Sequence, residues 1–235
     1  MTGVIWAAVL LAAGTPAPAA VPDGSRLVAG EQCFAIEREG QRIGDATQSV
    51  VAQELDGQLV WRIVIHQTLR NGRFSLRDEF VVARDSLRPL MLTSVRGNDP
   101  ASPGWQRIEL RYSPEGVTGT RTTAQSSAPI AVAHDGPVWD GNLWGLTFAA
   151  LPLAAGAEFS LPNWQYDKGP GTFTVRVVGE AIIETPAGPV AAWALDAGTD
   201  PAQLVRYHIA KGAGIELGYA GGGMAQRLAT DCPAR

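Results

Sequence analysis

Apolar and polar side chains alternate with a period of two in several stretches of this chain. Residues 60–67 place Trp61 and Ile65 on one face, and residues 107–112 and 172–177 alternate in the same way. Successive side chains of a β-strand point to opposite faces, so this pattern is typical of strands with one face in a core and the other in water. The alternation predicts a mainly β protein.

Short turn sequences separate these stretches at regular intervals. Asp56-Gly57 and Asn71-Gly72 each divide two strand-like segments, and Asn-Gly is a strong hairpin signal because both residues tolerate a positive φ. Residues 114–116 and 186–189 interrupt the pattern again. Consecutive strands joined by short turns pair as antiparallel neighbours. We therefore expect a curved antiparallel sheet or a partly closed β-barrel.

One segment departs from the strand pattern and carries apolar residues at helical spacing. The apolar residues of segment 142–151 include Leu143, Leu146, Phe148 and Leu151. Asp140 or Asn142 can cap the start of a helix here, and Pro152 stands just past its end. We expect one short helix that plugs the concave face of the sheet, within a single β-barrel-like domain of residues 31–232.

The N-terminal segment has the properties of an export signal. Residues 1–14 are uncharged and apolar, and residues 17–19 are the small residues that a signal peptidase reads. The apolar run is shorter than the roughly 20 residues that a membrane span needs. We predict a signal peptide over residues 1–19 and a leader over residues 20–30. The mature protein is then periplasmic or secreted, in a bacterial cell envelope, and does not span the membrane after cleavage.

Two cysteines, Cys33 and Cys232, lie near the two ends of the mature chain. Disulfides form and persist in exported proteins, so we predict a disulfide between them, with two unpaired thiols as the alternative. The two cysteines and three histidines form no ligand cluster of the usual spacing. We therefore expect no metal and no cofactor.

Composition limits the classes of partner. Hydrophobic residues make up 46% of the chain and charged residues 18%, which is enough apolar material for a packed core. The net charge is −4, with scattered arginines and no basic cluster. Nucleic-acid binders carry a basic patch, so we expect no nucleic-acid partner.

Several segments occur in a distinctive order along the chain: the turn at 40–44, the helix segment 140–146 that leads into 151–156, the segment 178–188, and the segment 205–210. This order resembles the bacterial exported proteins grouped as domain-of-unknown-function family 3108. His208 stands where that family usually has Trp, and the helix lacks the family's basic residue. The resemblance implies a curved antiparallel sheet, similar to the half-barrel of periplasmic lipoprotein carriers. It carries over no catalytic residue.

Candidate chemistry is sparse. Hydrolysis by His66 or His208 with a carboxylate is one hypothesis, although no Gly-x-Ser-x-Gly elbow accompanies it. Asp135 and Asp140 flank a Gly/Pro loop and are candidates for acid/base work on a sugar, but a turn and a helix cap explain them more simply. We expect no catalytic residue and favour a protein that is not an enzyme.

Aromatic residues around the expected helix suggest a binding site. Trp139, Trp144, Phe148 and Trp164 are the candidate ligand-binding residues, since a half-closed sheet with a helix across its mouth can contain an apolar ligand. Burial in an ordinary core is the alternative for all of them. The leading hypothesis is an exported carrier of a lipid-like or other apolar small molecule. A cell-envelope structural or assembly factor that binds a protein partner through a sheet edge is the runner-up.

Overall fold

A single curved 15-stranded sheet forms the protein in the computed structural model, which describes residues 21–69, 72 and 74–232. The first eight strands are β1 (Gly30–Arg38), β2 (Gln41–Leu55), β3 (Gln58–Leu69), β4 (Ser75–Ala83), β5 (Pro89–Arg96), β6 (Gln106–Ser113), β7 (Gly116–Thr123) and β8 (Ser127–Ala133). The others are β9 (Trp139–Asp140), β10 (Glu158–Gln165), β11 (Gly169–Thr185), β12 (Gly188–Gly198), β13 (Val205–Ala210), β14 (Glu216–Gly221) and β15 (Met224–Leu228).

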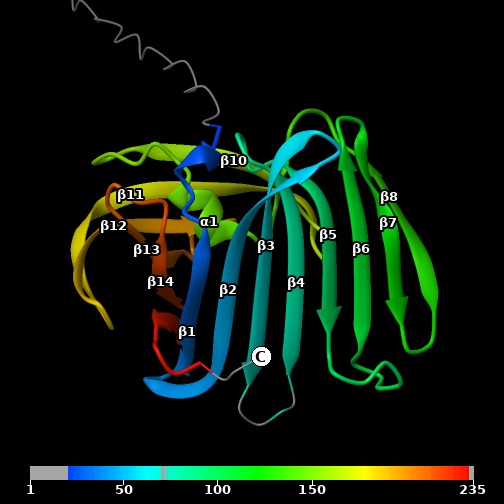
Figure 1. The fold of residues 1–235 in the computed structure, drawn as a ribbon, viewed down its shortest axis with the longest axis horizontal. Helices are drawn as coiled ribbons and strands as arrows, with labels where there is room; N and C mark the ends of the chain where they lie inside the picture. The colour runs from blue at the N-terminus through cyan, green and yellow to red at the C-terminus, as the bar shows by residue number, and fades with distance from the viewer. Residues whose placement is uncertain (1–20, 70–71, 73, 233–235) are drawn as a thin grey trace, which may run out of the picture.

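Neighbouring strands in the sheet are also neighbours along the chain, except where the first strand, β1, pairs with the last, β15. Each strand from β1 to β8 pairs antiparallel with the next, as does each strand from β10 to β15, and β1 pairs antiparallel with β15. The short β9 pairs in parallel with β10. Strands β8 and β9 are the two edges, so the sheet curls without closing, which confirms the expected curved, partly closed architecture (Figure 1).

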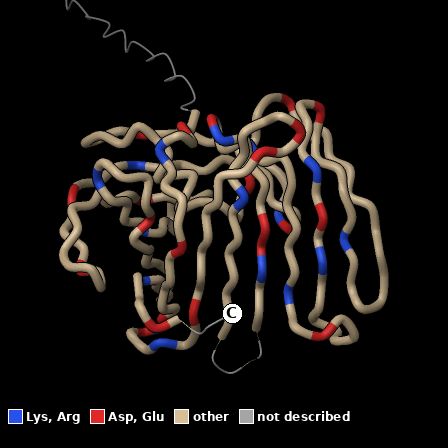
Figure 2. Tube along the Cα trace, in the orientation of Figure 1, with Lys and Arg blue, Asp and Glu red and all other residues tan. Residues whose placement is uncertain are grey.

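The predicted alternation places apolar residues inside the curl. Ile63 on β3 faces Phe80 on β4, which faces Leu92 on β5, and all three are buried. Charged residues of both signs lie along β4 to β6 (Figure 2), and the exposed positions of β6 alternate with buried ones. There Glu79 accepts hydrogen bonds from Arg62 at 2.7 Å and from Arg77 at 2.9 Å. Solvated pairs of this kind contribute less than about 1 kcal/mol each, so core packing carries the stability.

The helix α1 (Trp144–Ala149) is shorter than expected at both ends, but it lies inside the curl of the sheet (Figure 1). Its N-cap is Leu143, which makes no side-chain capping bond. Asp140 instead accepts a hydrogen bond from the Asn142 backbone N–H at 2.8 Å, within the turn that precedes the helix. All six residues of α1 are buried. Tertiary packing, rather than a capping side chain, therefore stabilises so short a helix.

The described part of the expected leader, residues 21–30, runs across one end of the barrel beside α1 (Figure 1). It contains a single 3-10 turn, η1 (Gly24–Arg26), and Asp23 N–H donates to the Ala150 carbonyl at 2.8 Å. The Trp61 indole N–H donates to the Gly24 carbonyl at 2.9 Å, and Leu27 is buried in the core. The expected signal peptide lies outside the described residues. Within those residues, no helix has the length and apolarity to cross a membrane.

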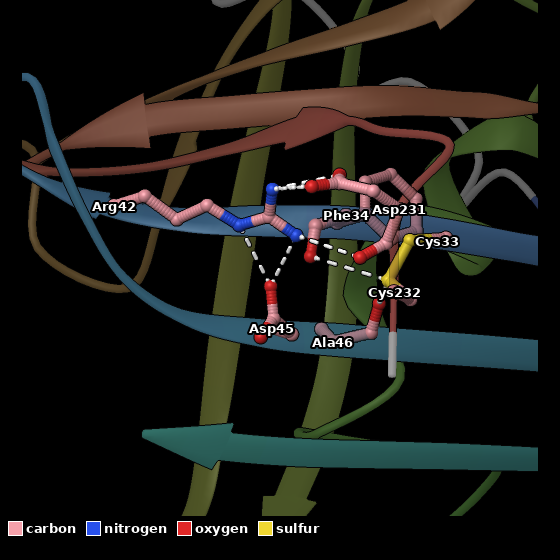
Figure 3. Close-up of polar contacts among 7 residues, drawn as sticks. All are labelled: Cys33, Phe34, Arg42, Asp45, Ala46, Asp231 and Cys232. Atoms are coloured by element: carbon pink, nitrogen blue, oxygen red, sulfur yellow. Dashed lines mark hydrogen bonds and ion pairs between the residues drawn. A yellow bond between two sulfur atoms is a disulfide. The ribbon is translucent and has the colours of Figure 1, made fainter. Parts of the chain in front are cut away.

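A disulfide fastens the closing joint between β1 and β15. Cys33 and Cys232 are bonded, with their Cα atoms 5.8 Å apart, which confirms the predicted pair (Figure 3). Beside it, Arg42 Nη1 donates to Asp231 at 2.7 Å and Nε donates to Asp45 at 2.7 Å. The covalent bond and the ion pairs together tie the C-terminal segment to β1 and β2.

Candidate functional site

The four candidate aromatic residues are buried in the core. Their exposed fractions are 2% for Trp139, 9% for Trp144, 0% for Phe148 and 3% for Trp164. Trp144 stacks on Phe173 with ring centroids 3.9 Å apart. None of the four forms an exposed rim, since the helix that carries two of them lies inside the sheet. Their assignment to ligand binding stays a prediction. Trp144 lines the second of the two cavities described below.

The first cavity, which we call the mouth hollow, has a volume of about 440 Å³ and opens among the turns at the leader end of the barrel. It lies between the β4–β5 turn, the β6–β7 turn and the loop of residues 134–138. Its apolar lining consists of Ala83, Pro89, Leu90, Pro114, Pro137 and Val138. Polar residues in the lining are Gln58, Asp85, Ser86, Arg88, Tyr112, Ser113 and His134. Trp139 supports the wall behind it, since its indole N–H donates to the Ser86 carbonyl at 3.1 Å.

The second cavity, which we call the Glu216 cavity, has a volume of about 160 Å³ and lies between the start of α1 and strands β2, β3, β13, β14 and β15. Glu216 is 7% exposed, and burial alone raises the pKa of its carboxyl group to about 7. Its carboxylate lies against Gly145, where any Cβ would overlap it. Any side chain at position 145 would therefore have to displace the Glu216 carboxylate from its present place.

A polar cluster crosses the interior between β4, β5, β6 and β9. Asp78 is hydrogen-bonded to Ser94, and burial raises the pKa of Asp78 to about 6. Asp140 accepts a hydrogen bond from the Tyr112 hydroxyl, and burial raises the pKa of Asp140 to about 6. Tyr112 thereby links β6 to the β9 edge. Asp135 is exposed while Asp140 is buried in this contact, so the bond to Tyr112 gives Asp140 a structural role.

The histidines lie apart from these acids. His66 on β3 is 3.3 Å from the Ser75 hydroxyl on β4. His208 is half-buried beside Arg206 and Arg227, and its pKa is lowered by burial and then by those two cations. His134 lines the mouth hollow. Among the described residues, no group of three or more His, Cys, Asp or Glu side chains is placed to hold a metal ion.

Sequence reasoning named Asp140 but missed the buried acids Asp78 and Glu216, of which only Asp78 leaves a signal. Asp78 shares the parity of Phe80 and Val82 along β4, so the alternation alone places it inside. Glu216 has no such signal, because the register between β13 and β14 shifts at His208/Ile209. The residue that makes room for it, Gly145, is on a different element. The Glu216 cavity therefore emerges only in three dimensions.

The fold and these two cavities can now be set beside known proteins. Residues 33–216 match a family, DUF3108, described as a protein of unknown function. The chain belongs to the DUF3108 family. No curated protein matches this DUF3108 chain. A solved structure with the same fold is the crystal structure of a beta-barrel-like protein of domain of unknown function DUF1849 from Brucella abortus.

The likeness to that structure concerns the fold alone. The two chains are 8% identical, with a TM-score of 0.52 over 87% of the DUF3108 chain and 97% of the other. Such low identity carries no information on residues or ligands. The family match confirms the resemblance drawn from the sequence, and the neighbour confirms the barrel-like architecture.

Proposed function

We propose that this DUF3108 protein is a non-enzymatic exported binding protein that carries a small apolar, lipid-like ligand in the mouth hollow. The volume of about 440 Å³ supports this, because small-molecule sites are concave and range from roughly 300 to 1,000 Å³. Most of the surface that lines it is apolar, although half of the lining residues are polar. Binding then gains free energy from burying apolar surface, at about 25 cal/mol per Å².

The position of this site differs from the one expected from the aromatic residues. Trp139 contributes from behind the wall, through its bond to the Ser86 carbonyl, rather than by touching the ligand. Arg88 and His134 line the hollow and are available to orient a polar end of the ligand. The hydroxyl of Tyr112 is already engaged with Asp140, so that residue offers mainly its ring.

Export is part of the proposal. The Cys33–Cys232 disulfide is compatible with an oxidising, extracytoplasmic compartment, where such bonds persist. A periplasmic location gives a carrier access to ligands of the cell envelope. Fractionation of cells that produce the full chain, with mass measurement of the mature N-terminus, tests this step separately from ligand binding.

Native mass spectrometry of protein purified without detergent tests the carrier function. We expect a discrete lipid-sized adduct that is released on unfolding. Leu90→Trp fills the hollow and should abolish the adduct, whereas Met91→Trp, at a neighbouring position that does not line the hollow, should retain it. Adduct retained in Leu90→Trp, or absent from the parent protein and not restored by added fatty acid, would contradict the proposal.

The β8 edge favours a second candidate, an envelope assembly factor. Residues 127–133 contain no charged side chain, and β8 terminates the sheet, so its outer backbone groups are available to another strand. A charge on an edge strand discourages such pairing. Ala131→Lys should then remove a specific envelope partner identified by cross-linking, while Leu90→Trp leaves that cross-link intact.

A further inference from the structure

The Glu216 cavity shares no lining residue with the mouth hollow. Glu216 is the first residue of β14, directly after the turn in which Ala210 N–H donates to the Ile215 carbonyl at 2.9 Å. The strand directs the Glu216 side chain toward Gly145 at the start of α1. The carboxylate of a glutamate is usually solvated, but the side chain of Glu216 lies in the interior of the sheet.

This carboxyl group has no counter-charge in the described part of the chain. No ion pair or side-chain hydrogen bond to its carboxylate is found there, and burial is the sole influence on its pKa. A buried, uncompensated carboxylate is costly unless it takes up a proton or a cation. The cavity beside it provides space for such a cation.

The surrounding amides present oxygen atoms to this space. Gln48 lines the cavity and its Nε2 donates to Gln32 Oε1 at 3.2 Å, and no hydrogen bond to its own side-chain oxygen is found among the described residues. Gln32 Nε2 in turn donates to the Glu216 backbone carbonyl at 3.0 Å, so this amide chain is fixed in direction. Asn142 also lines the cavity, but its buried atom without a partner among the described residues is Nδ2, a hydrogen-bond donor that offers nothing to a cation.

Aromatic rings complete the lining. Trp144, Tyr207 and Tyr219 all border the cavity, and Trp144 is held by its stack on Phe173. The faces of indole and phenol rings attract organic cations, most strongly where water is excluded. A divalent metal ion normally requires several carboxylates or histidines, whereas one carboxylate with amide oxygens and rings matches a singly charged group with N–H donors.

We propose that the Glu216 cavity binds the ammonium group of a small primary amine. The Glu216 carboxylate pairs with the cation, the Gln48 oxygen accepts one of its N–H bonds, and the ring of Trp144 covers its alkyl side. A cavity of about 160 Å³ accommodates an ammonium group with a short chain. The amine is either a free metabolite or the headgroup of an amino lipid, since both present the same group.

Isothermal titration with methylammonium chloride at about pH 8, where Glu216 is ionised, tests this site. We expect saturable binding at one site, with sodium, potassium and tetramethylammonium chloride at least about tenfold weaker. Glu216→Gln keeps the shape, removes the charge and should abolish binding. Asp78→Asn, which neutralises a buried acid outside the cavity, is the matched control and should bind within about twofold of the parent protein.

Two further ligands identify the source of the amine, and a second variant tests the site without removing the acid. Dihexanoyl phosphatidylethanolamine that binds more tightly than ethanolamine indicates a lipid headgroup, and equal binding indicates a free amine. Gln48→Leu leaves the acid in place and should weaken methylammonium about three- to tenfold. The proposal is overturned if methylammonium fails to saturate, if sodium or tetramethylammonium binds as tightly, or if folded Glu216→Gln binds normally. Loss of the lipid adduct in Leu90→Trp with methylammonium binding intact separates this site from the carrier site.

Discussion

Inward-facing side chains are apolar at one end of strands β3 to β6 and mainly polar at the other. At the end covered by the leader and α1, neighbouring strands meet through apolar residues, such as Ile63 opposite Phe80 and Phe80 opposite Leu92. Further along the same strands, the inward positions become mainly polar: Gln67, Asp78, Ser94, Arg96 and Gln106. One end of these strands is therefore a packed apolar core, while the other carries inward polar side chains, among them Asp78 of the polar cluster and Gln67 of the Glu216 cavity.

The difference shows how each end is held. The apolar end is stabilised by packing around α1, with Phe148 fully buried at its centre. The polar end carries the cross-links, because Cys33 pairs with Thr47 and Thr47 pairs with His66 at the level where β3 turns polar. The Arg42 ion pairs lie beside the disulfide (Figure 3). Covalent and ionic bonds thus reinforce a small second apolar cluster that contains Phe34 and Ala46.

Removing the disulfide is expected to have the largest effect. The pair Cys33→Ser and Cys232→Ser frees a loop with a sequence separation of 199 residues, for which the chain-entropy account gives a loss of about 5 kcal/mol. Urea denaturation of the parent and variant proteins measures it. A loss below about 1 kcal/mol would show that the polar end does not depend on this bond.

Truncation at the apolar end should cost slightly less. Phe148→Ala removes a ring that packs edge-on to Tyr207 at 4.9 Å between centroids, and cavity formation costs about 4 kcal/mol. Gln67→Ala, at the polar end, should change the free energy of unfolding by less than about 1 kcal/mol. The comparison between the two ends fails if urea denaturation gives both variants the same loss.

The pH dependence of stability reports on the polar end. The folded pKa of Glu216 is about 7 against an ordinary value of 4.5, so the folded state binds more protons than the unfolded state between these values. The contribution is full below about pH 4.5 and is lost as the pH rises through about 7. We expect the free energy of unfolding to fall by roughly 3 kcal/mol from this group.

A titration series of urea denaturation curves checks this window. Asp78 and Asp140, whose pKa values are also raised to about 6, act in the same direction. Glu216→Gln should flatten the upper part of the profile, while Glu54→Gln on an exposed strand end should leave it unchanged. Stability that rises between about pH 5 and 8 would contradict the assigned burial of these acids.

Local patterns predicted one of these ends better than the other. Alternation correctly placed Trp61 and Ile63 inside, and the spacing of Asp56-Gly57 and later turns predicted the meander. The positions of the two cysteines predicted the disulfide between Cys33 and Cys232. These properties depend on neighbouring residues or on compartment, which a sequence displays directly.

The candidate site was harder to predict because it depends on contacts between distant elements. The aromatic residues around α1 were expected near a rim, but a helix buried on every side has no rim face. Glu216 and Gly145 form a site only because β14 passes the start of α1, and no local pattern records that contact. The mouth hollow likewise arises where three separate turns meet.

The smallest expected effect is the loss of an ion pair on the outer face, which contrasts with the loss of the Arg42 ion pairs beside the disulfide. Arg62→Ala removes an ion pair from the half-exposed outer face, where solvent screens it, and should cost less than about 1 kcal/mol. Arg42→Ala should cost more, about 2 kcal/mol, because Asp45 is 6% exposed and loses a charged partner in a largely buried place. The difference between the two variants in urea denaturation should persist at high salt, since screening weakens the exposed Arg62 pair and spares the buried one. Equal losses would mean that the Arg42 pairs are surface contacts, and that the disulfide alone fastens the polar end.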